Sequence, residues 1–224
     1  MYGTTYRTAT QINESMGRVY GHMSIAVLIS MVVSYLVGNS PDLLQFFFTG
    51  ITKWIVIFSP LAILMVMSFA TEKFNKAQLQ LFLYGFSGLM GLSFATIFAV
   101  FTMGSIFTAF MGAAVLFGTM SFYGYFTKYD LSGVGQFMMV GLIAIIIASI
   151  INIFIGSTII QMVISAMSII IFLGLTAYDT QDIRKLVTGR VDSGREEVLG
   201  ALRLYMNFIN LFLSLLQLFG DRKQ

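Results

Sequence analysis

The residues best suited to do chemistry stand at the end of one long apolar run of the sequence and at the start of the next, where they could face each other. Asp179 follows one run, and Arg203 and Asn207 begin the next. An anion at the C-terminal end of a helix opposes the helix dipole, so a residue serving only solubility there would more often be basic. At 4 Å and an effective dielectric constant of about 20, Asp179 and Arg203 would attract each other by roughly 4 kcal/mol before desolvation. We predict a gating latch that protonation or a bound cation weakens, with a solvated surface ion pair as the alternative.

Polar side chains recur along the last apolar run at helical spacing. They are Arg203, Asn207, Asn210, Ser214, Gln217 and Asp221. Steps of three and four residues keep them within one narrow face of a helix. Since a helix surrounded by lipid would not carry such a line, this face must meet protein or water.

The two preceding apolar runs also carry polar positions that share a face. One run has Gln161, Ser165, Ser168, Thr176 and Asp179, and the run before it has Ser149 and Asn152. We predict that a polar path is lined by Asn210, Ser214, Gln217, Ser168, Thr176 and Asn152. The alternative for these residues is a set of hydrogen bonds that only hold the helices together.

The elements that must position these residues are membrane spans. Apolar residues make up 57% of the 224 residues and charged residues 10%, whereas soluble domains carry about 25% charged residues. Asp, Glu, Lys and Arg do not occur in 19–41, 54–71, 77–127, 131–178 or 204–220. Because one span needs about 20 apolar residues, the two longest of these ranges each hold two spans. We predict an all-α integral membrane protein with seven transmembrane helices, the last of them central and surrounded by the other six.

The expected spans are 22–38, 53–70, 78–100, 104–125, 136–156, 158–178 and 199–220. They form a single membrane domain, 22–220, between an N-terminal tail, 1–21, and a short C-terminal tail, 221–224. Seven spans leave nine Lys and Arg residues on the side of the N-terminus and three on the other side. The basic side of a membrane protein is cytoplasmic, so we expect a cytoplasmic N-terminus and a bacterial plasma (inner) membrane. A re-entrant last segment would instead make the count eleven against one.

Several classes of protein are excluded by the composition. The chain has no Cys and one His, which excludes disulfides, thiolate metal sites and multi-histidine metal sites. Its net charge of +3 comes from Lys and Arg residues in short loops, so we expect no nucleic acid as partner. Hydrolase signatures such as His-Glu-x-x-His and Gly-x-Ser-x-Gly are absent from the sequence, and we expect neither enzymatic activity nor a cofactor.

An intramembrane aspartyl protease is the enzyme class that needs a specific argument. Tyr178 and Asp179 resemble its first motif, but the second motif, Gly-x-Gly-Asp, has Leu218 in place of its first glycine before Gly220 and Asp221. A helix over 199–220 is about 33 Å long, which puts Asp179 and Asp221 at opposite membrane faces. We therefore expect no aspartyl dyad.

Three stretches resemble the Bax-inhibitor family of membrane proteins, specifically its bacterial members. They are Met-Ser-Phe-Tyr-Gly-Tyr-Phe-Thr-Lys-Tyr-Asp-Leu-Ser-Gly at 120–133, Gly-Leu-Thr-Ala-Tyr-Asp-Thr-Gln at 174–181, and the run from Gly200 to Gly220. The resemblance covers about 15–223. It implies the seven-helix fold with a surrounded last helix, and a cation leak, mainly for calcium, that responds to pH.

The resemblance also implies a sensor made of two acidic residues, one from each of the last two helices. Asp179 matches the first residue, but Asn207 stands where the family pattern has Asp. Arg203 replaces a commonly neutral residue, and Gln217 replaces a common Arg. Two facing carboxylates share a proton, and an Asp–Asn pair lacks that repulsion. We therefore expect a pH response that is weaker or shifted to acidic pH, and only a weak calcium site at Asp179.

A second function, in a different class, stays open. Some family members resemble modulators of a membrane-bound protease, and the polar residues 1–18 could supply the contact surface. The sequence is thus also compatible with a regulator of a membrane-bound protease or of cell stress that acts through protein contacts. In both hypotheses, membrane lipid is a partner, and in the first, calcium is the transported or regulatory ion.

Overall fold

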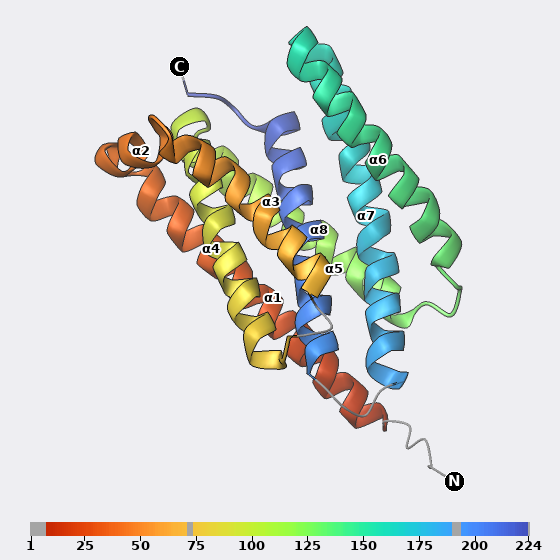
Figure 1. Ribbon diagram of the computed structural model, residues 1–224. Coiled ribbons are helices and arrows are strands. Elements are labelled where there is room, and N and C mark those ends of the chain that lie inside the picture. The colour runs from red at the N-terminus through yellow and green to blue at the C-terminus, as the bar shows by residue number, and fades with distance from the viewer. Residues whose placement is uncertain (1–7, 71–73, 190–193, 224) are drawn as a thin grey trace. The chain divides into compact units, whose positions relative to one another are not determined.

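The computed structural model describes residues 8–70, 74–189 and 194–223. Within these ranges the chain forms eight α-helices (Figure 1). They are α1 (Ala9–Gly38), α2 (Pro41–Phe48), α3 (Thr52–Ala70), α4 (Lys76–Val100), α5 (Met103–Phe126), α6 (Ser132–Ile155), α7 (Thr158–Gly189) and α8 (Arg195–Phe219). The predicted all-α class is confirmed.

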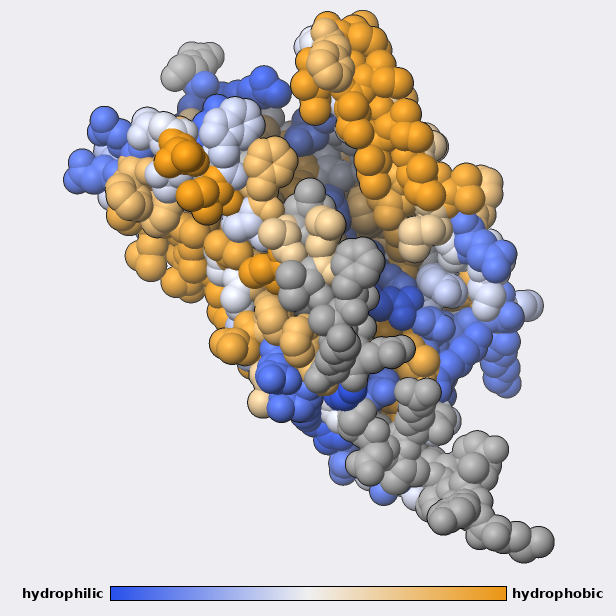
Figure 2. All heavy atoms as spheres, viewed as in Figure 1, coloured by the Kyte–Doolittle hydropathy of each residue, from blue (hydrophilic) through white to orange (hydrophobic). Residues whose placement is uncertain are grey.

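Six of these helices, α1, α4, α5, α6, α7 and α8, are long and apolar enough to cross a membrane. The helix α3, which corresponds to the predicted second span, is not among them, so the seven-span arrangement stays a prediction. The most apolar window of α6 is only 6% buried, and Figure 2 shows its hydrophobic side chains on the surface. The corresponding window of α8 is 67% buried. Exposed apolar surface of this length is typical of a helix in contact with lipid, whereas the burial of α8 shows that it packs mainly against protein.

Two helices extend well beyond the predicted spans. The helix α1 begins at Ala9, inside the predicted N-terminal tail, where Thr8 and Gln11 form a capping box. Met16, Val19 and Met23 are buried at helical spacing along it, which stabilises the polar first part of this helix. At the other end of the chain, α7 continues past residue 178 to Gly189.

The chain divides into two compact units. The first comprises Met1–Phe101, Val187–Tyr205 and Arg222–Gln224, and the second comprises Thr102–Leu186 and Met206–Asp221. The helix α8 thus contributes 195–205 to the first unit and 206–219 to the second. Its place at the centre of six other helices stays a prediction.

In the first unit α1 and α4 lie side by side (Figure 1). A Cβ added at Gly91 of α4 would lie 2.7 Å from the backbone oxygen of Ser30 in α1, so only glycine permits this approach. Ser30 Oγ in turn donates to the backbone oxygen of Ser87, 2.7 Å away. Small residues therefore set the distance between these helices, as is common in membranes.

In the second unit α6 and α7 run antiparallel and in contact (Figure 1), with Gly141 of α6 against Ile171 of α7. The second part of α8 meets α5 through aromatic rings. Phe208 packs edge to face against Phe110 and Phe117, with centroid distances of 5.4 and 5.7 Å. Such pairs add packing energy beyond the area that they bury, by about 0.5–1.5 kcal/mol each.

Candidate functional site

The most unusual polar contact of the second unit joins α7 to α8. Asn207 Nδ2 donates to Asp179 Oδ2 at 2.7 Å, and the two residues are 5% and 8% exposed. A hydrogen bond to an ionised group contributes about 1.5–3 kcal/mol, and a buried partner left without it loses at least as much. The structure therefore brings together two of the three residues predicted as the latch.

Close packing surrounds the residues that precede Asp179. A Cβ at Gly124 of α5 would collide with the backbone of Ala177, and a Cβ at Gly135 of α6 would collide with the ring of Tyr178. One residue after Asp179, the hydroxyls of Thr180 and Ser121 lie 3.0 Å apart. Because α5 and α6 both pack closely against α7 here, the part of α7 that carries Asp179 is held in place.

The loop between α5 and α6 is tied to the same part of α7. Gln181 accepts a hydrogen bond from the backbone N–H of Leu131 at 2.9 Å and donates to the backbone oxygen of Tyr129 at 2.7 Å. Arg184 donates to the backbone oxygen of Tyr125 at 2.6 Å and lies 4.6 Å from the centre of its ring. Sequence reasoning missed these positioning contacts and the two glycines, although both glycines lie in or beside the stretch 120–133.

An exposed ion pair completes this connection. Lys185 Nζ lies 2.8 Å from Asp130 Oδ1, and the hydrogen bond from Lys185, followed by those from Ser132, lowers the pKa of Asp130. Because the folded-state pKa lies below the unfolded one, the pair stabilises the fold above the ordinary pKa of Asp, and this contribution is lost as the pH falls through the lowered pKa.

We expect Lys185→Gln to raise the pKa of Asp130 toward its ordinary value, because the first of these donors loses its charge. Measurement is by NMR titration of a selectively labelled carboxyl carbon. Ser132→Ala serves as the matched control and should raise the pKa by less. An unchanged pKa in Lys185→Gln would contradict the contact.

A second polar cluster lies farther along α8 and joins α6, α7 and α8. Gln161 Nε2 donates to Gln217 Oε1 at 2.6 Å, and Ser165 Oγ donates to the same oxygen at 3.3 Å. Asn152 Nδ2 donates to Gln161 Oε1 at 3.3 Å. The polar lines expected on these three helices therefore do meet, at Asn152 and Gln217 among the predicted path residues.

Between the two clusters, the predicted path residues bond to their own helices. Asn210 Nδ2 donates to the backbone oxygen of Met206 at 2.8 Å, and Ser214 Oγ donates to that of Asn210 at 2.7 Å. Thr176 Oγ1 bonds in the same way to Phe172, and Ser168 is buried. These bonds lie within single helices and therefore do not hold two helices together. In the described part of the chain, no buried side-chain nitrogen or oxygen is without a hydrogen-bond partner.

The remaining predicted latch residue, Arg203, belongs to the first unit, whereas Asp179 belongs to the second. An ion pair between them stays a prediction. In the described ranges, no group of three or more His, Cys, Asp or Glu side chains is placed to hold a metal ion. The weak calcium site expected at Asp179 likewise stays a prediction.

The first unit holds a buried carboxylate that sequence reasoning did not single out. Glu197, in the first turn of α8, has a side chain that is 3% exposed. Arg18 of α1 lies 2.8 Å from Oε1, and Lys76 of α4 lies 3.2 Å from Oε2. Arg18 and Lys76 are among the nine basic residues expected on the side of the N-terminus, and their distance from Glu197 in the sequence hides the cluster.

Tyr205 links the same three helices deeper in the first unit. Its hydroxyl lies 2.7 Å from Ser30 Oγ of α1, and its ring meets that of Phe86 of α4 at a centroid distance of 5.9 Å. The first part of α8 is therefore held by both an ion-pair cluster and a buried hydroxyl pair.

Comparison with known proteins finds similarity over nearly the whole chain. The family described as "Inhibitor of apoptosis-promoting Bax1" matches residues 12–224. The inner membrane protein YbhL of Escherichia coli K12 is 37% identical over 214 residues, which cover 93% of this chain and 92% of YbhL. An uncharacterized protein of Deinococcus radiodurans is 31% identical over 222 residues, which cover 98% and 95% of the two chains.

Proposed function

We propose that this chain, which belongs to the Bax-inhibitor family and is a multi-pass protein of the bacterial inner membrane, is a pH-sensitive leak channel for cations, calcium among them. The observation that carries the proposal is the buried hydrogen bond between Asp179 and Asn207. An ionisable residue inside a membrane-spanning helix is costly and usually marks an ion pathway, a relay or a gate.

The Asp179–Asn207 bond acts in this proposal as the closed latch. Ionised Asp179 accepts the amide hydrogen of Asn207 and so holds α7 against α8. A proton on the carboxylate removes the charge that strengthens this bond, and a cation beside it competes for the same oxygen. Opening is thus favoured by acid or by the arriving cation.

The path past the open latch follows the polar face of α8. Asn210 and Ser214 come next along this face, and Gln217 follows. The bonds of Asn210 and Ser214 stay within α8, so water or a cation can replace them without separating two helices. We further propose that α3 completes a seven-span bundle around α8, that the N-terminus is cytoplasmic, and that Arg203 adds a positive charge to the latch.

Flux into liposomes tests the proposal. We expect the purified chain to admit calcium above the rate of protein-free liposomes, and Asp179→Ala to raise this rate about tenfold at pH 7, because a charge-assisted bond of about 1.5–3 kcal/mol no longer favours the closed state. Asp42→Ala, which changes an exposed acidic residue of α2, is the matched control. No flux from folded protein, or the same rate in wild type and Asp179→Ala, would contradict the proposal.

A further inference from the structure

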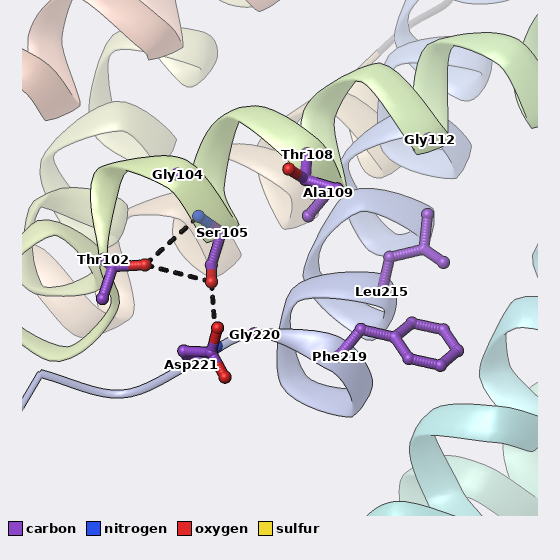
Figure 3. A pocket seen from close by; sticks show the side chains of 10 residues that line it. All are labelled: Thr102, Gly104, Ser105, Thr108, Ala109, Gly112, Leu215, Phe219, Gly220 and Asp221. Carbon is purple, nitrogen blue, oxygen red and sulfur yellow. Dashed lines mark hydrogen bonds between the residues drawn. The ribbon is translucent and has the colours of Figure 1, made fainter.

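A cavity of about 420 Å³ lies in the second unit, between the first turns of α5 and the last turn of α8 (Figure 3). Its residues on α8, Leu215 and Phe219, stand farther along the helix than Asn207. At 1.5 Å per residue, Phe219 lies about 18 Å beyond Asn207. The cavity is therefore separate from the latch, and the conduction proposal makes no use of it.

The rim of the cavity is polar and ordered by hydrogen bonds. Thr102 Oγ1 donates to Ser105 Oγ at 3.1 Å, and the backbone N–H of Asp221 donates to the same oxygen at 2.9 Å. The backbone N–H of Thr102 donates to the backbone oxygen of Asp221 at 3.0 Å. These bonds fix Asp221 through its backbone, and Asp221 also lines the cavity. Thr108 adds a third hydroxyl to the lining.

The floor of the cavity is hydrocarbon. It is formed by Ala109 and Gly112 of α5 and by Leu215 and Phe219 of α8. Gly112 provides much of the room, because a Cβ there would reach only Leu215 Cδ1, at 3.7 Å. Pockets of roughly 300–1,000 Å³ with an apolar lining and a few polar groups are typical of sites for small organic molecules.

This lining does not suit a calcium ion. Calcium takes six to eight oxygen ligands, whereas the cavity offers one carboxylate, three hydroxyls and an apolar floor. An ammonium group attached to hydrocarbon fits both parts, since its three N–H donors need a few oxygen acceptors. The C-terminal end of α8 adds negative partial charge, which favours a cation. The start of α5 adds positive partial charge, and the Thr102 side chain offsets part of it by capping the helix.

We propose that this cavity binds an organic ammonium ion, with its charged nitrogen at the Asp221 carboxylate and its apolar part against Phe219 and Leu215. Such an ion can come from a soluble amine or from an aminophospholipid headgroup.

Binding to the full chain in phosphatidylglycerol nanodiscs tests the proposal, with 2-phenylethylammonium as probe and uncharged 2-phenylethanol as its matched analogue. We expect calorimetry to show tighter binding of the ammonium ion. Asp221→Asn should weaken that binding about three- to tenfold and leave the alcohol unaffected, while Asp42→Asn changes neither. Equal affinity for the two probes, or no effect of Asp221→Asn, would overturn the proposal.

Two further arms complete the test. Gly112→Leu should abolish binding of both probes by filling the floor of the cavity. Gly112→Ala, whose Cβ fits without displacement, should weaken the binding of both probes by less, and it keeps this arm of the test available if Gly112→Leu does not fold. Competition by added phosphatidylethanolamine would identify a lipid headgroup as the natural source, and its absence a soluble amine. Displacement of the probe by millimolar calcium at constant ionic strength would instead assign the cavity to a metal ion and overturn the proposal.

Discussion

Asn207→Asp is expected to reverse the sign of the pH dependence of calcium flux. In the wild type, the amide of Asn207 lies 2.7 Å from Asp179, and in the proposed function this bond keeps the latch closed at neutral pH and weakens in acid. Two buried carboxylates at that distance cannot both be ionised without strong repulsion, so they hold one proton between them. The shared proton closes the latch of the variant at low pH, and its loss opens the latch as the pH rises.

Flux measured at four pH values between 5 and 8, with the same pH on both sides of the liposome membrane, distinguishes the two slopes. Asn210→Asp is the matched control, because it adds a carboxylate to the same face of α8, where the native amide bonds only to the backbone oxygen of Met206. The control should keep the slope of the wild type. Parallel profiles for wild type and Asn207→Asp would rule out the latch as the pH-sensitive element.

The order and limits of most helices follow from where the charges stop. The ends of α4, α5 and α6 agree with the predicted spans to within a few residues, because only short turns separate these helices. The ends of α1 and α7 do not, since α1 starts at Ala9 and α7 runs to Gly189. A stretch without charges marks the part of a helix that lipid surrounds, whereas a helix can continue into water, where charged side chains are solvated.

The candidate site could be predicted only where its residues repeat along one helix. The spacing along 203–221 predicted a polar face, and the structure brings Asn207 of that face to Asp179. The glycines at 124 and 135 and the partners of Gln181 depend on how α5 and α6 meet α7, which no periodicity within one helix records. Glu197 is the extreme case, because it is separated by 179 and 121 residues from Arg18 and Lys76.

Arg18→Met combined with Lys76→Met is expected to lower the free energy of unfolding by about 3 kcal/mol, at the low end of the range for uncompensated buried charges. The double variant leaves a carboxylate that is 3% exposed without either cation, while the side chains of Arg18 and Lys76 are 47% and 41% exposed. Glu197→Gln should therefore cost less, because the two cations that it leaves behind can turn toward water.

Each single replacement, Arg18→Met or Lys76→Met, should cost well under half of the double variant, because one cation still compensates Glu197. The excess in the double variant is the coupling between the two cations through their shared carboxylate. Thermal unfolding in one detergent at pH 7 measures all four variants, and the same double variant on a Glu197→Gln background is the control, in which the excess should disappear. Additive single effects, or an excess that persists without the carboxylate, would contradict the coupling through Glu197. The two basic residues would then act through the packing of their long side chains, and the buried charge of Glu197 would not need them as counter-charges.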